Sequence, residues 1–177
     1  MTITRDKLYE AEYFLNRMIE KQSDRAAFKF NLSAFLAAFR SITLIMQKEY
    51  KHYQDFDDWY KPYKEDFVAD NRMKLLNEKR VQTIHLKPLE PKAHVDVEII
   101  DTITISDSVS IILKQANGTI ERYESKPQPP KSPKEEKTTV KWRWYFEEMP
   151  DTDVITICQE CISKLQAIVT ECEQKFN

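Results

Sequence analysis

Residues 31–50 read NLSAFLAAFRSITLIMQKEY, and this stretch decides the fold. Its aromatic and aliphatic side chains recur every three or four residues, which is the period of an α-helix. Alanine and leucine fill most of the other positions, so the helix is apolar nearly all round. A helix of this kind is typical of the centre of a helical bundle. We predict that it spans about residues 26–50.

Three further helices are expected around this central one. The first, at about residues 5–20, has one apolar face. The next, at about 63–84, follows an aromatic connector at 56–63 in which Pro62 marks a kink or a helix start. The last, at about 152–176, carries apolar residues at three- and four-residue steps, and we expect that stripe to return to the bundle.

Between the third and fourth predicted helices the hydrophobic period changes from 3.6 to 2, which indicates β-strands. Alternation begins near Val95, Asn117-Gly118 is a signal for a type I′ hairpin, and residues 138–146 form an aromatic strand. Residues 126–137 hold four prolines and predict a loop. We therefore expect a small antiparallel meander inserted at about 94–147. The fold class is α+β, mainly a helical bundle, in a single domain over residues 1–177.

Composition limits the classes of function. A single glycine in 177 residues excludes glycine-rich phosphate loops. The net charge of −2 means that RNA would be bound through a local site rather than a broad basic surface. The start of the chain lacks the apolar run of a signal peptide, and residues 32–46 are too short and too polar to cross a bilayer. We predict a cytoplasmic protein without membrane contact.

Cysteine, histidine and tryptophan residues offer weaker candidates for a site. Cys158 and Cys161 form C-x-x-C without a second pair, on the apolar stripe of the last helix, which favours core packing over zinc or redox chemistry. Nothing brings the histidines together, so we expect no metal and no cofactor. Trp142 and Trp144 share one face of their strand; covering the bundle is favoured over stacking on bases.

Two arginines interrupt apolar helix faces. On a helical wheel, Arg80 lies within about 40° of Met73, Leu76 and Ile84. An arginine there pairs with a carboxylate, extends its head to water or binds a substrate. Arg40 is the other basic residue within an apolar helix body. It is either a second phosphate contact or the partner of an acid such as Glu78.

His85 follows Arg80 at the end of the third predicted helix. Histidine suits proton transfer, since its unperturbed pKa is about 6.5. Side chains five residues apart on a helix point about 140° apart, so the pair meets only if the helix end unwinds. A symmetric dimer could instead place two such sets around one cleft. Read without a family, His85 is an ordinary exposed histidine.

The segment KRVQTIH, residues 79–85, fits the R-x4–6-H motif near the end of the third helix of HEPN domains. The order of predicted helices also resembles the HEPN superfamily, over residues 1–85 and 151–177, whereas the inserted sheet departs from the minimal bundle. The resemblance implies a metal-independent endoribonuclease, often dimeric. In it, His85 acts as acid or base and Arg80 holds the scissile phosphate.

Three functional hypotheses follow. The first is an RNA endonuclease, as a toxin or a defence or stress effector, with RNA as substrate, an antitoxin-like protein as partner and a homodimeric state. The alternative is a non-catalytic HEPN-like module that binds nucleotide, RNA or protein. A third is purely structural. The enzyme needs Arg80 and His85 in a common cleft, whereas the structural hypothesis expects Arg80 to be buried against a carboxylate.

Overall fold

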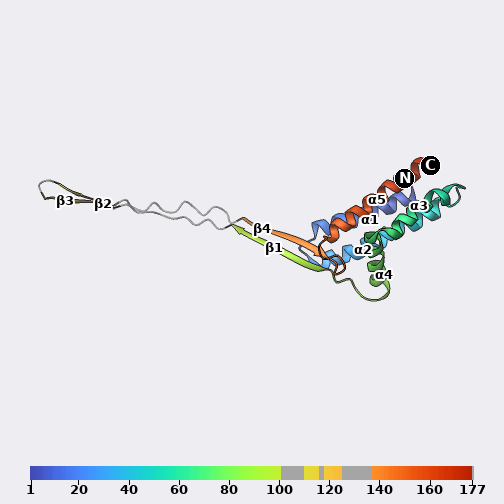
Figure 1. The fold of residues 1–177 in the computed structure, drawn as a ribbon, viewed down its shortest axis with the longest axis horizontal. Helices are drawn as coiled ribbons and strands as arrows, with labels where there is room; N and C mark the ends of the chain where they lie inside the picture. Colours follow the sequence, from blue (N-terminus) through green and yellow to red (C-terminus); the bar gives the residue numbers. More distant parts are fainter. Residues whose placement is uncertain (101–109, 116–117, 125–136, 177) are drawn as a thin grey trace. The chain divides into compact units, whose positions relative to one another are not determined.

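The fold is taken from a computed structural model that describes residues 1–100, 110–115, 118–124 and 137–176 (Figure 1). The chain divides into two compact units, one made of Met1–His94 and Trp142–Asn177, the other of Val95–Lys141. All the helices of the described residues lie in the first unit, which confirms a mainly helical α+β fold. That the two units form a single domain stays a prediction.

Three long helices make up most of the first unit. These are α1 (Ile3–Glu20), α2 (Arg25–Tyr50) and α5 (Val154–Phe176), each within two residues of its predicted bounds. Helix α1 packs against both α2 and α5, and α2 also contacts α5 (Figure 1). The central position of α2 is confirmed, since its core residues are fully or almost fully buried. They include Phe28, Leu32, Phe35, Leu36, Phe39, Ile42 and Met46.

Helix α2 is also long and apolar enough to cross a membrane, judged by length and composition alone. In this structure its apolar side chains form the core of the bundle with α1, α4 and α5. A buried central helix of a soluble protein has the same length and composition.

The predicted helix at 63–84 is wrong, because the structure has two helices there. Helix α3 spans Phe56–Ala69 and α4 spans Asn71–His85. Asp70 separates them: its backbone is extended, and its carboxylate accepts hydrogen bonds from the backbone N–H groups of Arg72 and Met73. An aspartate that caps a new helix in this way ends the previous one.

The predicted aromatic connector is the first part of α3, and Pro62 lies inside that helix. A proline inside a helix deprives the carbonyl four residues earlier, here that of Asp58, of its helical donor. Both residues are exposed, so water can satisfy that carbonyl and the helix continues.

The strands that the structure describes form two pairs. Strand β2 (Ser110–Lys114) is antiparallel to β3 (Ile120–Glu124), with Ser110 opposite Glu124. Gly118 adopts φ +88°, the left-handed conformation that glycine tolerates, and its N–H donates to the carbonyl of Gln115 at 3.0 Å. The predicted hairpin is thereby confirmed. Its predicted two-residue type I′ turn is wrong, because the N–H of Gln115 donates to the carbonyl of Thr119 at 2.8 Å and three residues separate these two. The predictions for residues 101–109, Asn117 and residues 125–136 lie outside the described residues.

The predicted meander is wrong, because β1 (Lys92–Ile100) pairs with β4 (Lys137–Tyr145). Strands adjacent in sequence are neighbours in most sheets, which is why a meander was expected. A two-residue period identifies strands but does not encode which strand pairs with which.

The end of β4 is anchored in the first unit by two tryptophans. Trp144 is fully buried, stacks on Phe28 with ring centroids 4.4 Å apart, and donates from Nε1 to the carbonyl of Gln22 at 3.0 Å. Trp142 stacks on Trp144 at 6.1 Å. Both cover the bundle from one face of the strand, as predicted. Because Trp144 is fully buried, its ring cannot stack on a nucleic-acid base.

A carboxylate of α2 caps the start of α1. Glu49 accepts hydrogen bonds from the backbone N–H groups of Ile3 at 3.0 Å and Thr4 at 2.8 Å, and from the Thr4 hydroxyl at 2.6 Å. Partial burial raises the pKa of Glu49, but these hydrogen bonds outweigh it, so the net shift is downward. The negative charge also complements the positive end of the α1 dipole.

Replacing Glu49 with glutamine should lower the free energy of unfolding at pH 7 by about 1–2 kcal/mol, because charge-assisted hydrogen bonds are lost. The folded-state pKa of Glu49 is lowered, so its contribution is present above the ordinary pKa and is lost as the pH falls through the folded value. Urea unfolding should therefore show the two proteins converging between about pH 5 and pH 3. The control Glu65→Gln, at an exposed position of α3, should match wild type; a difference as large at pH 3 as at pH 7 would contradict the prediction.

Candidate functional site

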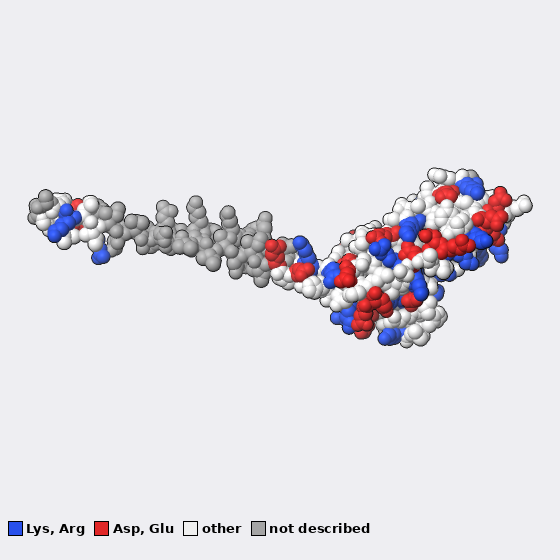
Figure 2. Space-filling view, in the orientation of Figure 1, with Lys and Arg blue, Asp and Glu red and all other residues white. Residues whose placement is uncertain are grey.

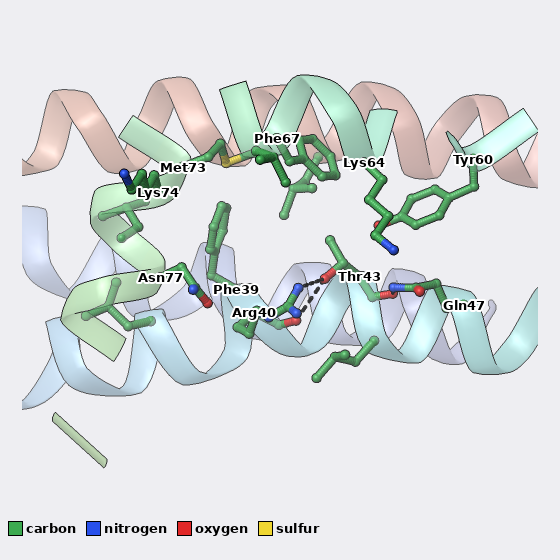
Figure 3. Close-up of a pocket in the computed structure, with 15 residues that line it drawn as sticks. Phe39, Arg40, Thr43, Gln47, Tyr60, Lys64, Phe67, Met73, Lys74 and Asn77 are labelled. Carbon is green, nitrogen blue, oxygen red and sulfur yellow. Dashed lines mark hydrogen bonds between the residues drawn. The ribbon is translucent and has the colours of Figure 1, made fainter. Parts of the chain in front are cut away.

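A cavity of about 480 Å³ lies among α2, α3 and α4, with Leu165 of α5 in its wall (Figure 3). This volume falls within the range of small-molecule sites, roughly 300–1,000 Å³. One part of its lining is apolar: Leu36, Phe39, Leu44, Phe67, Val68, Met73, Leu76 and Leu165. The other part is polar: Arg40, Thr43, Gln47, Tyr60, Lys64, Lys74 and Asn77.

The α3–α4 corner that borders the cavity is pinned to α5. Asp70, between the two helices, forms an ion pair with Lys164. Partial burial raises the pKa of Asp70, but the bonds from Lys164 and from two backbone amides lower it by more. Farther along α3, Trp59 Nε1 and the Tyr63 hydroxyl donate to Glu171 at 2.9 and 2.8 Å. These contacts fix α3 against α5 and leave its Tyr60–Lys64 side facing α2 across the cavity (Figure 3).

Five polar residues of the lining gather where α2 faces α3, and we call them the donor cluster: Arg40, Thr43, Gln47, Tyr60 and Lys64 (Figure 3). The first three lie on one face of α2, since they are three and seven residues apart, and the last two are four apart on α3. Arg40 Nη1 donates to Thr43 Oγ1 at 2.8 Å. The Gln47 amide donates to the backbone carbonyl of Thr43 at 2.9 Å.

The charge lining the cavity has one sign. Arg40, Lys64 and Lys74 are cationic, and no aspartate or glutamate is among the lining residues. Within the described ranges, none of these three cations forms an ion pair. Other cations of the helical unit do, such as Arg5 with Glu173 and Lys79 with Glu148. The cavity therefore carries a positive potential that a bound anion would neutralise.

Tyr60 contributes a hydroxyl donor to this site. The residue is only 5% exposed, and burial raises the pKa of its phenol, while the charge of Arg40 and a hydrogen bond with Thr43 lower it by less. The net shift is upward, so the phenol stays protonated at neutral pH. It can therefore donate to an anion without adding negative charge of its own.

The structure does not bring the predicted pair Arg80 and His85 into this cavity. Arg80 is half-buried on α4, and its Nε is buried without a hydrogen-bond partner. Among the residues that the structure describes, Arg80 forms no ion pair, so the carboxylate of the structural hypothesis is not found there. His85 is the last residue of α4 and is exposed, as is Ile84 beside it, so the apolar stripe ends before them.

The sequence left two roles open for Arg40: a phosphate contact, or the ion-pair partner of an acid such as Glu78. No ion pair joins Arg40 to Glu78 in the described chain. Instead, Arg40 bonds to Thr43 and lines the cavity, where its guanidinium remains available to a ligand.

The cysteines occupy the core, as predicted. Cys158, Cys161 and Cys172 are buried on α5. Burial raises the pKa of Cys161 and of Cys172 to about 12, so these thiols are neutral and unreactive at pH 7. Over the described residues, no group of three or more His, Cys, Asp or Glu side chains is placed to hold a metal ion.

Sequence reasoning identified Arg40 but missed the rest of the donor cluster. Thr43 and Gln47 share its helix face, and this polar stripe on an apolar helix was the available signal. Tyr60 and Lys64 escaped because residues 56–63 were assigned to a connector, which put the two on different elements.

Replacing Arg40 with methionine keeps an aliphatic side chain but removes a charge that has no carboxylate partner. We expect the free energy of unfolding to be unchanged or higher by up to about 1 kcal/mol. Arg5→Met, which strips Glu173 of its ion pair, should instead lower it by about 1–3 kcal/mol. Urea unfolding at pH 7 measures both. If Arg40→Met lowers the free energy of unfolding by more than about 1 kcal/mol, the guanidinium stabilises the fold, and the role in ligand binding loses its support.

In a comparison with known proteins, residues 3–176 match the family model described as "Bacteriophage lambda protein ea47". No curated protein and no solved structure matches the chain. The predicted HEPN resemblance is wrong, since this family covers nearly the whole chain and no HEPN model matches. The R-x4–6-H spacing is short enough to occur by chance on a helix rich in basic residues, and the third helix on which it was placed is in fact two helices.

Proposed function

The chain belongs to the bacteriophage lambda ea47 family, and we propose that it is a non-catalytic binding protein whose ligand occupies the cavity among α2, α3 and α4. The observation that carries this proposal is the lining: apolar walls combined with three cations that form no ion pair within the described chain. Lys64 and Lys74 are exposed and Arg40 is half-buried, so all three can meet a ligand from solvent, and cations gathered at an apolar cavity without a carboxylate favour binding of an anion.

The lining also favours binding over catalysis. It holds no histidine, cysteine, aspartate or glutamate, which are the usual general bases and nucleophiles. A few polar groups at one side of an apolar cavity are instead typical of a site that orients a small molecule.

A cytoplasmic location is part of the proposal. It is supported by the burial of α2 inside the bundle and by three cysteines that remain free thiols. The homodimer and the antitoxin-like partner stay predictions.

Binding in the cavity can be tested with N-phenyl-1-naphthylamine, a neutral apolar dye whose fluorescence rises on leaving water. We expect saturable binding to wild type at one site. Asn77→Trp places a large ring in the cavity lining and should weaken dye binding at least tenfold, which is about 1.4 kcal/mol. Glu78→Trp, exposed on α4 and outside the lining, should bind as wild type does. Equal binding by all three proteins would place the dye elsewhere and remove support for the cavity.

A metal-independent RNA endonuclease is kept as a second candidate by one observation. The Nε of Arg80 is buried without an acceptor, and His85 is exposed five residues later on the same helix. In this candidate, a phosphate oxygen of RNA binds the accessible part of the half-buried Arg80 side chain rather than its buried Nε.

Labelled RNA incubated in EDTA with wild type, Arg80→Ala and His85→Ala tests this candidate. If the endonuclease exists, wild type alone cleaves and leaves 2′,3′-cyclic phosphate ends, while each variant loses at least about 100-fold in rate. Circular dichroism checks that the variants fold. Equal cleavage by all three proteins would trace the activity to a contaminant or another site, and no cleavage by any would leave the binding protein as the only candidate.

A further inference from the structure

The polar part of the cavity consists of hydrogen-bond donors on one side. The donor cluster offers a guanidinium, an ammonium, a phenol and an amide, while its fifth member, the Thr43 hydroxyl, donates to the Arg40 carbonyl. No carboxylate lies among the residues that line the cavity (Figure 3). Such a lining disfavours cations and favours an oxyanion, whose oxygens accept several hydrogen bonds at once.

We propose that the ligand is an organic phosphate: a phosphate monoester dianion on a flat apolar body, with its phosphate on the donor cluster. This inference rests on the proposed binding function and names the ligand class for it.

The charge count favours a dianion. Arg40 and Lys64 both belong to the donor cluster, and neither forms an ion pair within the part of the chain that the structure describes. One phosphate monoester, with two negative charges near neutral pH, balances both, whereas a carboxylate leaves one cation uncompensated. The planar guanidinium of Arg40 matches two phosphate oxygens, and the ammonium of Lys64 adds a point charge.

Two buried hydroxyls lie beside these cations, and they have different roles. Thr43 is 5% exposed; its Oγ1 donates to the Arg40 carbonyl at 3.1 Å and accepts from Arg40 Nη1 at 2.8 Å, which holds the guanidinium on the cavity side of α2. Tyr60 is equally buried, and its raised pKa keeps the phenolic proton that a phosphate oxygen would accept. The cluster is therefore oriented before a ligand arrives, which lowers the entropic cost of binding.

The rest of the cavity fits a flat apolar group. Phe39 projects from α2 and Phe67 from α3 into the space between the helices, with Met73 of α4 beside them (Figure 3). Aromatic walls favour a planar body through stacked or edge-on contacts. Lys74 lies beside Met73 rather than in the donor cluster, and as an exposed cation it would attract the anion to the cavity rather than hold its phosphate (Figure 3).

Three naphthalene compounds separate the contributions of charge and body. 1-Naphthyl phosphate, 1-naphthoate and 1-naphthol share the ring but carry two, one and no negative charges at pH 7.5. Titration calorimetry should show the phosphate binding wild type at least tenfold more tightly than naphthol, with naphthoate between them. Inorganic phosphate, which lacks the apolar body, should bind at least tenfold more weakly than naphthyl phosphate.

Two cavity variants and two matched controls locate the phosphate. Arg40→Met and Lys64→Met should each weaken naphthyl phosphate at least tenfold and leave naphthol within about twofold. Arg25→Met and Lys61→Met, exposed on the same two helices and outside the lining, should bind as wild type does. Thermal unfolding checks that each variant folds, and because the two cavity variants lie on different helices, either one can carry the test.

Several outcomes would overturn the inference. These are naphthol binding as tightly as naphthyl phosphate, naphthoate binding more tightly than both, inorganic phosphate matching naphthyl phosphate, or naphthyl phosphate unaffected by either cavity variant. In each case, dye binding blocked by Asn77→Trp would keep the proposed binding function intact. Loss of dye binding to the cavity would instead remove that function itself.

Discussion

The burial of α2 is the constraint on which the rest of the helical unit depends. Its apolar side chains cover more than one face, so α1, α4 and α5 must all pack against it. The stripe Arg40, Thr43 and Gln47 is the exception, since an arginine and a glutamine cannot be closed under an apolar neighbour without losing their contact with water. On that side α2 faces Tyr60 and Lys64 of α3 across a cavity (Figure 3). The cavity therefore follows from the same helix that forms the core.

The surface of the helical unit drawn in Figure 2 offers no broad charged patch for an anion, so the candidate anion site is confined to the cavity. The face shown in Figure 2 carries acidic and basic side chains interspersed, without a broad basic patch. Many of these charges are satisfied in pairs, such as Arg72 with Glu160 at 2.8 Å, and exposed pairs of this kind contribute little to stability. What distinguishes the cavity is that three cations line it together with apolar walls and that no carboxylate is among its lining residues.

Sequence patterns predicted what depends on periodicity and failed where a single residue or a distant pairing decides. The stripes of α1, α2 and α5 and the hairpin at Gly118 were predictable because side-chain spacing and turn chemistry are local. The break at Asp70 was missed because apolar spacing continues across it, although an aspartate followed by asparagine is a helix-start signal. Pairing of β1 with β4 is long-range and leaves no periodic trace. Of the donor cluster, only Arg40 was identified from sequence. Its partners on α3, Tyr60 and Lys64, could be placed on one helix only if α3 was predicted to begin at Phe56. The weight given to Arg80 and His85 came from a family resemblance that the chain does not bear out.

The pairing of β1 with β4 brings together the two points at which the chain leaves and rejoins the helical unit, and the stack of Trp144 on Phe28 fastens one of them. Closing a segment at its base costs loop entropy, which grows by about 0.6 kcal/mol for each doubling of length. In evolutionary terms, the stretch between those points can be lengthened, shortened or exchanged with little penalty to the helices, whereas α2 and its neighbours are held to their sequence by packing. The helical unit and the inserted one are thus free to diverge at different rates within one gene.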